Sequence, residues 1–309
     1  MSTDARHSTV VADGVPLHVV ESGAPEGRPF LFLHGWPESW RTWLGVMEAA
    51  RDEARIIAID LPGIGGSTRA VGDRSTRQAG DGSKLRLART VHALVRELGL
   101  TGATLVGHDA GGMAAYAYLR QFADTEGVQG AEGVQGVDRV VIMNTVVPGV
   151  APWDDVLRNP HIWHFGLHTV PALPETLVQG RQAAYFDYFY DVLSPDPRRI
   201  TAESRAAHAA AYDSPEALTA GFDLYRAFGQ DARDNAAFAA AGPVGTPLLY
   251  VRGDAEGGDI RAYARGLREA GVENLTTAVV ADAGHFAQEE RPAEVWALVR
   301  DFAATATAG

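Results

Sequence analysis

Asp109 lies in the segment Gly107-His-Asp-Ala-Gly-Gly112, a turn crowded with glycines. A buried strand is predicted before this turn and a helix after it, and glycines permit the sharp, strained junction between them. A side chain at the tip of such a junction is raised above the carboxyl edge of a sheet. A carboxylate there can attack an alkyl electrophile and form a covalent ester. The alternative is that Asp109 only caps the helix, a position that aspartate favours.

A histidine occupies a similar turn near the end of the chain, in the segment Ala283-Gly-His-Phe286, directly after the last predicted strand. A carboxylate nucleophile has no proton to release, so we expect His285 to deprotonate a water that then attacks the ester. The order nucleophile, acid, histidine along the chain is typical of nucleophiles on sharp strand-to-helix turns. A purely structural histidine is the alternative.

Three carboxylates follow the strand that ends before residue 253, namely Asp254, Glu256 and Asp259. One of them should accept the imidazole N–H and hold the tautomer that leaves the other nitrogen free for water. We favour Glu256, with Asp254 and Asp259 as alternatives; each of the three taken singly could instead be a solvated loop charge. A rival location, the end of the strand at 140–143, carries Asn144, whose amide cannot supply a negative charge.

The segment Phe32-Leu-His-Gly-Trp-Pro37 is predicted to supply an oxyanion hole. A strand that ends in His-Gly-x-Pro lets a backbone N–H, here that of Trp36, point toward the turn at Asp109. The backbone N–H of Ala110 would be the second donor. His34 is expected to be a structural histidine rather than a base.

Strand and helix patterns alternate along most of the chain. After a hairpin around residues 13–14, buried strands are predicted at 30–33, 55–61, 103–107, 139–143, 247–252 and 276–281, with helices at 38–50, 84–98, 111–122, 259–270 and 292–304. This alternation indicates the α/β class, with a mostly parallel sheet flanked by helices. A duplicated pentapeptide at 126–130 and 132–136 predicts an expanded surface loop.

The region 149–242 lacks strand signals and is helical and rich in aromatic residues. We expect it to be an inserted helical cap (lid) domain on a core formed by residues 1–148 and 243–309. The aromatic run at 185–190 is predicted to be cap core or an oligomer contact, and a homodimer is therefore a candidate assembly.

Composition excludes several classes of function. The chain of 309 residues carries a net charge of −12, so it lacks the basic stripe of a nucleic-acid binder, and without cysteine it has no thiolate or disulfide chemistry. No apolar run is long enough for a membrane span, which favours a cytoplasmic protein that does not bind membranes. His161, His164 and His168 are spaced by three and four, but no HExxH pattern or neighbouring carboxylate accompanies them, so no metal site is expected.

Four motifs together resemble the epoxide hydrolase branch of the α/β-hydrolase fold superfamily, over about residues 10–305. They are His34-Gly-Trp-Pro37, Asp60-Leu-Pro-Gly63 with Gly66-Ser67, Gly107-His-Asp-Ala-Gly-Gly112 and Gly284-His285. The resemblance implies an α/β-hydrolase fold with an inserted helical cap, and no cofactor. It also implies a small, mostly apolar epoxide as substrate, opened to a vicinal diol through an Asp109 ester that His285-activated water hydrolyses.

The resemblance extends to the cap. In this family cap side chains, usually two tyrosines, donate hydrogen to the epoxide oxygen. The segment 220–226 is similar to the second cap tyrosine followed by arginine, which implies Tyr225. The segment 162–165 is similar to a subgroup in which a histidine replaces the first tyrosine, which implies His164, and an imidazole N–H can donate as a phenol can.

Differences between this sequence and the related dehalogenase families decide which alternative functions are kept. Haloalkane dehalogenases hold the halide with a tryptophan just after the nucleophile and usually an asparagine in the oxyanion turn, where this chain has Ala110 and Trp36. Fluoroacetate dehalogenases carry arginines after the nucleophile, and none stands here. Trp163, a candidate pocket residue, could contact a halide, so a haloalkane or haloacid dehalogenase is the runner-up. A catalytically silent ligand-binding protein of the same fold is the alternative from another class.

Overall fold

The strands form one sheet in the computed structural model, which describes residues 5–68, 82–123 and 136–305. Their order across the sheet is β1-β2-β4-β3-β5-β6-β7-β8. Only the pairs β1/β2 and β2/β4 are antiparallel, and this confirms the predicted α/β class with a mostly parallel sheet. The strands are β1 (Arg6–Ala12), β2 (Val15–Gly23), β3 (Pro29–Leu33), β4 (Arg55–Ile59), β5 (Ala103–His108), β6 (Val137–Met143), β7 (Leu248–Gly253) and β8 (Leu275–Val280).

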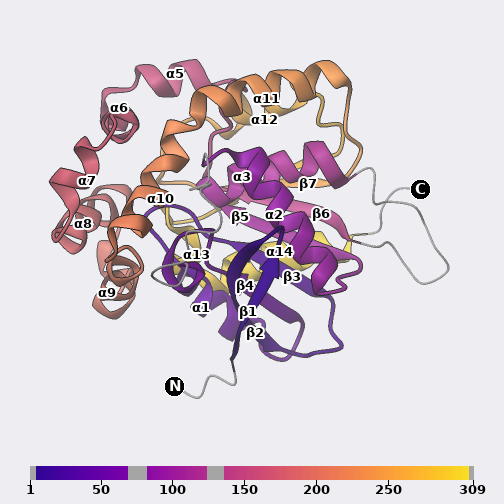
Figure 1. Ribbon diagram of the computed structural model, residues 1–309. Helices are drawn as coiled ribbons and strands as arrows, with labels where there is room; N and C mark the ends of the chain where they lie inside the picture. Colours follow the sequence, from indigo (N-terminus) through magenta and orange to yellow (C-terminus); the bar gives the residue numbers. More distant parts are fainter. Residues whose placement is uncertain (1–4, 69–81, 124–135, 306–309) are drawn as a thin grey trace.

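Helices cover both faces of the sheet (Figure 1). One face packs against α2 (Lys84–Glu97), α3 (Ala110–Tyr118) and α12 (Ile260–Glu269), and the other against α1 (Leu44–Ala49) and α14 (Pro292–Ala304). Because successive side chains of a strand point to opposite faces, Leu31 and Leu33 of β3 join the first core cluster while Phe30 and Phe32 join the second. Both faces of the central strands are therefore buried.

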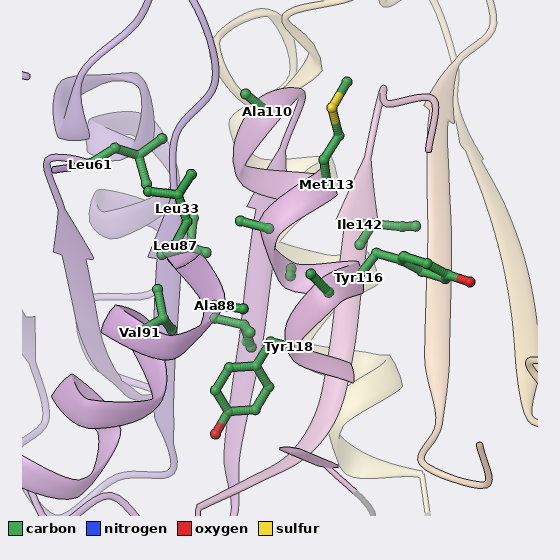
Figure 2. Packing of buried hydrophobic residues seen from close by; sticks show 14 of the residues in the cluster. Leu33, Leu61, Leu87, Ala88, Val91, Ala110, Met113, Tyr116, Tyr118 and Ile142 are labelled. Atoms are coloured by element: carbon green, nitrogen blue, oxygen red, sulfur yellow. The ribbon is translucent and has the colours of Figure 1, made fainter. Parts of the chain in front are cut away.

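The packing of α2 and α3 sets the position of the turn before α3. Figure 2 shows Leu87, Ala88 and Val91 of α2 beside α3, whose Tyr116 and Tyr118 lie among the same buried side chains.

The sequence predicted the bounds of α2 and α14 to within one residue. It missed α13 (Ala287–Glu290), and it predicted one helix at 38–50 where a 3-10 helix, Trp40–Trp43, precedes α1. The predicted helix at 111–122 ends instead as a π-helix at Leu119–Ala123.

Only helices lie between β6 and β7 in the described chain, as expected for the region 149–242, although the division into core and cap domains stays a prediction. In Figure 1, α7, α8 and α9 lie to one side of the sheet. The helices are α5 (Trp153–Arg158), α6 (Trp163–Thr169), α7 (Leu173–Val178), α8 (Gln182–Leu193), α9 (Ala202–Ala210), α10 (Pro215–Arg226) and α11 (Phe228–Ala241).

Buried polar contacts join these helices to the rest of the chain. The Lys84 ammonium at the start of α2 lies 2.8 Å from the Asp231 carboxylate of α11, and both side chains are almost fully buried. The hydroxyl of Tyr190 in α8 donates to the Pro37 carbonyl, at 2.8 Å, and that of Tyr212 to the Glu38 carbonyl, at 2.9 Å. Residues of the helical region therefore hold the backbone that follows β3.

Two further expectations concern the duplicated pentapeptide and the absence of a membrane span. The duplicated pentapeptide lies, but for its last residue, outside the described residues. No helix within the described ranges combines the length and the apolar character needed to cross a membrane.

Candidate active site

Asp109 stands on a strained turn between β5 and α3. Its φ of 48° lies in the left-handed region that non-glycine residues seldom adopt. A Cβ on Gly35 would overlap the Asp109 side chain, and one on Gly107 would overlap the Gly111 carbonyl, so only glycine fits these positions. Although Asp109 precedes the helix, its side chain makes no capping hydrogen bond. The helix-cap alternative therefore finds no support in the geometry.

One oxygen of this carboxylate is held by the predicted oxyanion loop. The Trp36 backbone N–H donates to Asp109 Oδ1 at 2.9 Å. An ester formed on the other oxygen would leave Oδ1 as the carbonyl oxygen, already placed on a main-chain donor. Ala110 is buried beside it, but its backbone N–H donates no hydrogen bond to the carboxylate in the described structure. His34 has both ring nitrogens bonded, to the Gly35 carbonyl and the Leu61 N–H, as expected of a structural histidine.

His285 follows β8 and faces the second oxygen of the nucleophile. Its Nε2 lies 3.8 Å from Asp109 Oδ2, and its Nδ1 lies 2.8 Å from Glu256 Oε1. The carboxylate holds Nδ1 as the protonated nitrogen and leaves Nε2 able to accept from a water. Burial raises the pKa of Glu256, but Arg252 and His285 outweigh burial, so the net pKa is lowered and the acid stays ionised.

The structure brings Glu256, and neither neighbouring acid, to His285. Asp254 instead accepts the Ala283 N–H at 3.3 Å, and Asp259 caps α12 by accepting the Arg261 N–H at 2.9 Å. All three carboxylates are in one short loop, and only the loop's path distinguishes them.

Asn144, the residue at the rival acid position, touches Glu256. Its amide nitrogen donates to Glu256 Oε2 at 2.8 Å and to the Gly284 carbonyl at 3.0 Å. An amide at the end of β6 therefore supports an acid supplied from the end of β7. The sequence excluded Asn144 as the acid but gave no sign of this supporting contact.

A second buried pair, His108 and Glu38, lies beneath the nucleophile and was not identified from the sequence. His108 Nδ1 is 2.7 Å from Glu38 Oε2, and Nε2 is 2.8 Å from the His285 carbonyl oxygen. Both nitrogens face acceptors, so the ring is an imidazolium. Burial alone would lower the pKa of His108, but the Glu38 carboxylate raises it to about 9. The charged ring ties the Asp109 turn to the His285 loop.

Tyr225 of α10 and His164 of α6 face the Trp36 ring, with centroids 5.5 and 6.3 Å from it and 5.9 Å from each other. Burial, with the nearby charge of Asp109, raises the pKa of Tyr225 well above its usual value, so the phenol keeps its proton. Burial, with His285, lowers the pKa of His164 to about 3, so this ring is neutral at pH 7 and carries one N–H. No described residue forms a hydrogen bond with the Tyr225 hydroxyl, and His164 Nδ1 is buried without a partner.

Aromatic rings complete the surroundings of Trp36. Five more rings lie within 6.3 Å of its centroid, those of His168, Tyr185, Phe186, Phe189 and Phe222. The surroundings of Trp36 beside the nucleophile are therefore mostly aromatic rings, which suit an apolar ligand.

Trp163 and His161 are exposed, unlike the buried rings of His164 and His168. The Trp163 side chain is 40% exposed, and its indole N–H donates to the Tyr188 hydroxyl at 3.4 Å, which places Trp163 at the outer edge of the aromatic group. His161 belongs to the preceding 3-10 helix and is exposed, so it does not share the buried face of His164 and His168. Among the residues the structure describes, no three potential ligands are grouped around a metal position.

Comparisons with known proteins agree with this architecture. The model of the α/β hydrolase fold family matches residues 28–292. A soluble epoxide hydrolase of Corynebacterium sp. (strain C12) is 27% identical over 300 residues, covering 94% of this chain and 95% of that protein. The crystal structure of Cfl2 from Burkholderia cenocepacia has a TM-score of 0.81 and 31% identity, covering 96% of this chain and 95% of its own. The epoxide hydrolase CorEH has a TM-score of 0.79 and 26% identity, covering 97% and 98%. The chain belongs to the α/β-hydrolase fold family, in the branch that contains epoxide hydrolases.

Proposed function

We propose that this enzyme hydrolyses a small, mostly apolar epoxide to a vicinal diol through a covalent ester on Asp109. The observation that carries the proposal is that the two oxygens of the Asp109 carboxylate face different groups. Asp109 Oδ1 accepts the Trp36 N–H, whereas Oδ2 faces His285, with Tyr225 and His164 on the cap side. The names of the related epoxide hydrolases support the same substrate class.

Ring opening uses the cap. Asp109 Oδ2 attacks an epoxide carbon and its C–O bond to the ring oxygen breaks, so negative charge develops on that oxygen. The Tyr225 phenol, which burial keeps protonated, gives its proton to the alkoxide, and the neutral His164 ring donates a hydrogen bond from its single N–H. The products are a hydroxyalkyl ester and a tyrosinate, which regains a proton before the next turnover.

Ester hydrolysis uses the His285–Glu256 pair. His285 Nε2 takes a proton from a water, and the resulting hydroxide adds to the Asp109 carbonyl carbon while the Trp36 N–H binds the oxyanion. Collapse breaks the acyl C–O bond, and the imidazolium returns its proton to the departing alkoxide. The diol keeps the former Oδ2 oxygen, and the water oxygen remains on Asp109.

A dehalogenase would use the same Asp109 and His285, but the structure favours the epoxide. The Trp163 N–H that could bind a halide is already donated to the Tyr188 hydroxyl. The Tyr225 hydroxyl, in contrast, has no hydrogen-bond partner among the described residues and can protonate an alkoxide, whereas a departing halide needs no proton.

Isotope transfer tests the proposal. One turnover in water enriched in oxygen-18, with enzyme in excess over a styrene-type epoxide, should label the Asp109 carboxylate and leave the first diol unlabelled. Mass spectrometry of the peptide containing Asp109 reads the label, and Asp109→Asn is the matched control. An active enzyme whose Asp109 stays unlabelled contradicts the covalent mechanism, and halide release from a haloalkane panel without epoxide turnover contradicts the substrate class.

A further inference from the structure

Arg252, near the end of β7, is a buried cation that the mechanism above does not use. Its side chain is 7% exposed, and its guanidinium carbon lies 4.2 Å from the centroid of the Tyr263 ring. One terminal nitrogen donates to the Tyr250 hydroxyl at 3.0 Å, and the other to the Gly257 carbonyl at 2.9 Å. The second nitrogen also lies 2.8 Å from Glu256 Oε2. The Tyr263 ring, the Tyr250 hydroxyl and the Gly257 carbonyl therefore hold the planar guanidinium against Glu256, the acid that binds His285.

The two oxygens of Glu256 have separate partners. Oε1 accepts from His285, while Oε2 accepts from Asn144 and is paired with Arg252. The negative charge that should stabilise a protonated His285 is thus shared with a permanent cation on the far side of the same carboxylate. A lone carboxylate would direct its whole charge to the imidazolium.

We propose that Arg252 is a positioning residue that offsets the charge of Glu256 and so makes His285 a weaker base, which stays neutral, and able to activate water, at lower pH. The inference rests on the proposed function only in assigning His285 to water activation. The charge relationship between Arg252, Glu256 and His285 stands apart from it.

Other charged and titratable groups also surround the His285–Glu256 pair. Around His285 they are Asp109, His108, His164 and Glu290, and around Glu256 they are Tyr250 and Tyr263. The His108 ring is 4.8 Å from that of His285 and is itself charged, so two cations flank the His285–Glu256 pair. Among these charged groups, Arg252 is the one paired with Glu256 Oε2.

The test replaces Arg252 and follows pH dependence. In Arg252→Gln we expect the acidic limb of single-turnover ester hydrolysis to move upward by about one pH unit, the lower end of the effect of a neighbouring charge. Ester formation on Asp109 should be little changed, because no contact of Arg252 reaches that carboxylate. Arg252→Lys keeps the charge without the planar fork, so its limb should stay near that of the wild type even if its rate falls. Arg261→Gln, an exposed arginine of the adjacent α12, is the matched control for a lost positive charge.

A second readout needs no turnover. The midpoint of the His285 ring titration, followed by NMR, should rise in Arg252→Gln by the same amount as the kinetic limb. Arg252→Met offers an apolar side chain of similar length if the glutamine variant does not fold. Equal limbs in wild type and Arg252→Gln, or an equal shift in the glutamine and lysine variants, would overturn the inference, since the second result would mark a purely structural anchor. Absence of any Asp109 ester in the wild type would sink the proposed function instead, and the NMR titration would still decide the role of Arg252.

Discussion

The Nε2 atom of His285 lies 3.8 Å from Asp109 Oδ2, beyond the range of a hydrogen bond. A serine nucleophile needs a direct hydrogen bond to its histidine because it must lose a proton, whereas a carboxylate does not. The gap leaves Nε2 free to accept from a water once the ester has formed. The geometry thus fits a histidine that serves the second half of the reaction.

Replacing His285 should separate the two half-reactions. In His285→Gln, Asp109 keeps the Trp36 N–H and the Tyr225 hydroxyl remains available, so we expect the ester to form and then persist. Intact-protein mass spectrometry should show an increase equal to the mass of the epoxide, in one copy per chain. Asp109→Asn should show no adduct and lose about 10⁴-fold or more in kcat/KM. A His285→Gln variant that turns over normally without accumulating adduct would remove His285 from the mechanism.

The three acids of the loop after β7 provide a matched series. Glu256→Gln should slow ester hydrolysis by about 10³- to 10⁴-fold, because an amide can donate to Nδ1 and favour the wrong tautomer. Asp254→Asn should leave the rate within a factor of about three, and Asp259→Asn likewise, since asparagine also caps helices well. Single-turnover rates after rapid mixing measure this step directly. An equal loss in Asp254→Asn would show that the acid is not unique to Glu256.

Cap variants should affect the first half-reaction instead. Tyr225→Phe should slow ester formation by about 10²- to 10⁴-fold, the usual contribution of a positioned general acid, while hydrolysis of a preformed ester stays unchanged. His164→Gln keeps an N–H donor and should lose less than His164→Phe. The expectation is checked by the rate of adduct formation in a His285→Gln background. Tyr188→Phe, which changes an exposed tyrosine of the same region, is the control.

Local sequence pattern was enough to pick out residues that the structure brings together. Asp109 and His285 stand in glycine-rich turns at strand ends, and such turns leave a mark in the sequence. The choice of Glu256 over its two neighbours followed from position within the loop, and the contacts agree with it. The strand–helix alternation also predicted the mostly parallel sheet, because fully buried strands read as short apolar runs.

Contacts between distant positions could not be predicted in this way. Glu38 and His108 are 70 positions apart, and Asn144 and Glu256 are 112 positions apart. The local sequence around each residue therefore does not indicate its partner. In the sequence, Arg252 is an ordinary arginine at a strand end, and its contacts with Glu256 and Gly257 arise only because the loop after β7 folds back on it. The second-donor role predicted for the Ala110 N–H also remains a prediction, since the amide makes no such bond here.

The pair Lys84–Asp231 should contribute to stability by joining α2 to α11. Lys84→Met would leave the buried Asp231 carboxylate without its cation, and we expect the free energy of unfolding to fall by about 3 kcal/mol. Burial raises the pKa of Asp231 despite Lys84, which places the loss at the low end for such pairs. Urea denaturation measures it. The double variant Lys84→Met/Asp231→Leu should recover most of the loss, and Arg158→Met, from an exposed pair, should change stability by less than about 0.5 kcal/mol.

The charged His108 ring should make stability depend on pH in an alkaline window. Its pKa is about 9 in the folded chain and about 6.5 when unfolded, so the folded state holds the proton more tightly. The stabilisation is therefore fully present below about pH 6.5 and is lost as the pH rises through 9. Urea denaturation between pH 6.5 and 9.5 should show the free energy of unfolding falling by a few kcal/mol in the wild type. The fall should be markedly smaller in a His108→Gln variant, whereas the exposed His161→Gln control should keep it. A wild-type profile that stays flat or rises across this window would mean that the ring is neutral, and that the Glu38 carboxylate does not hold its second proton.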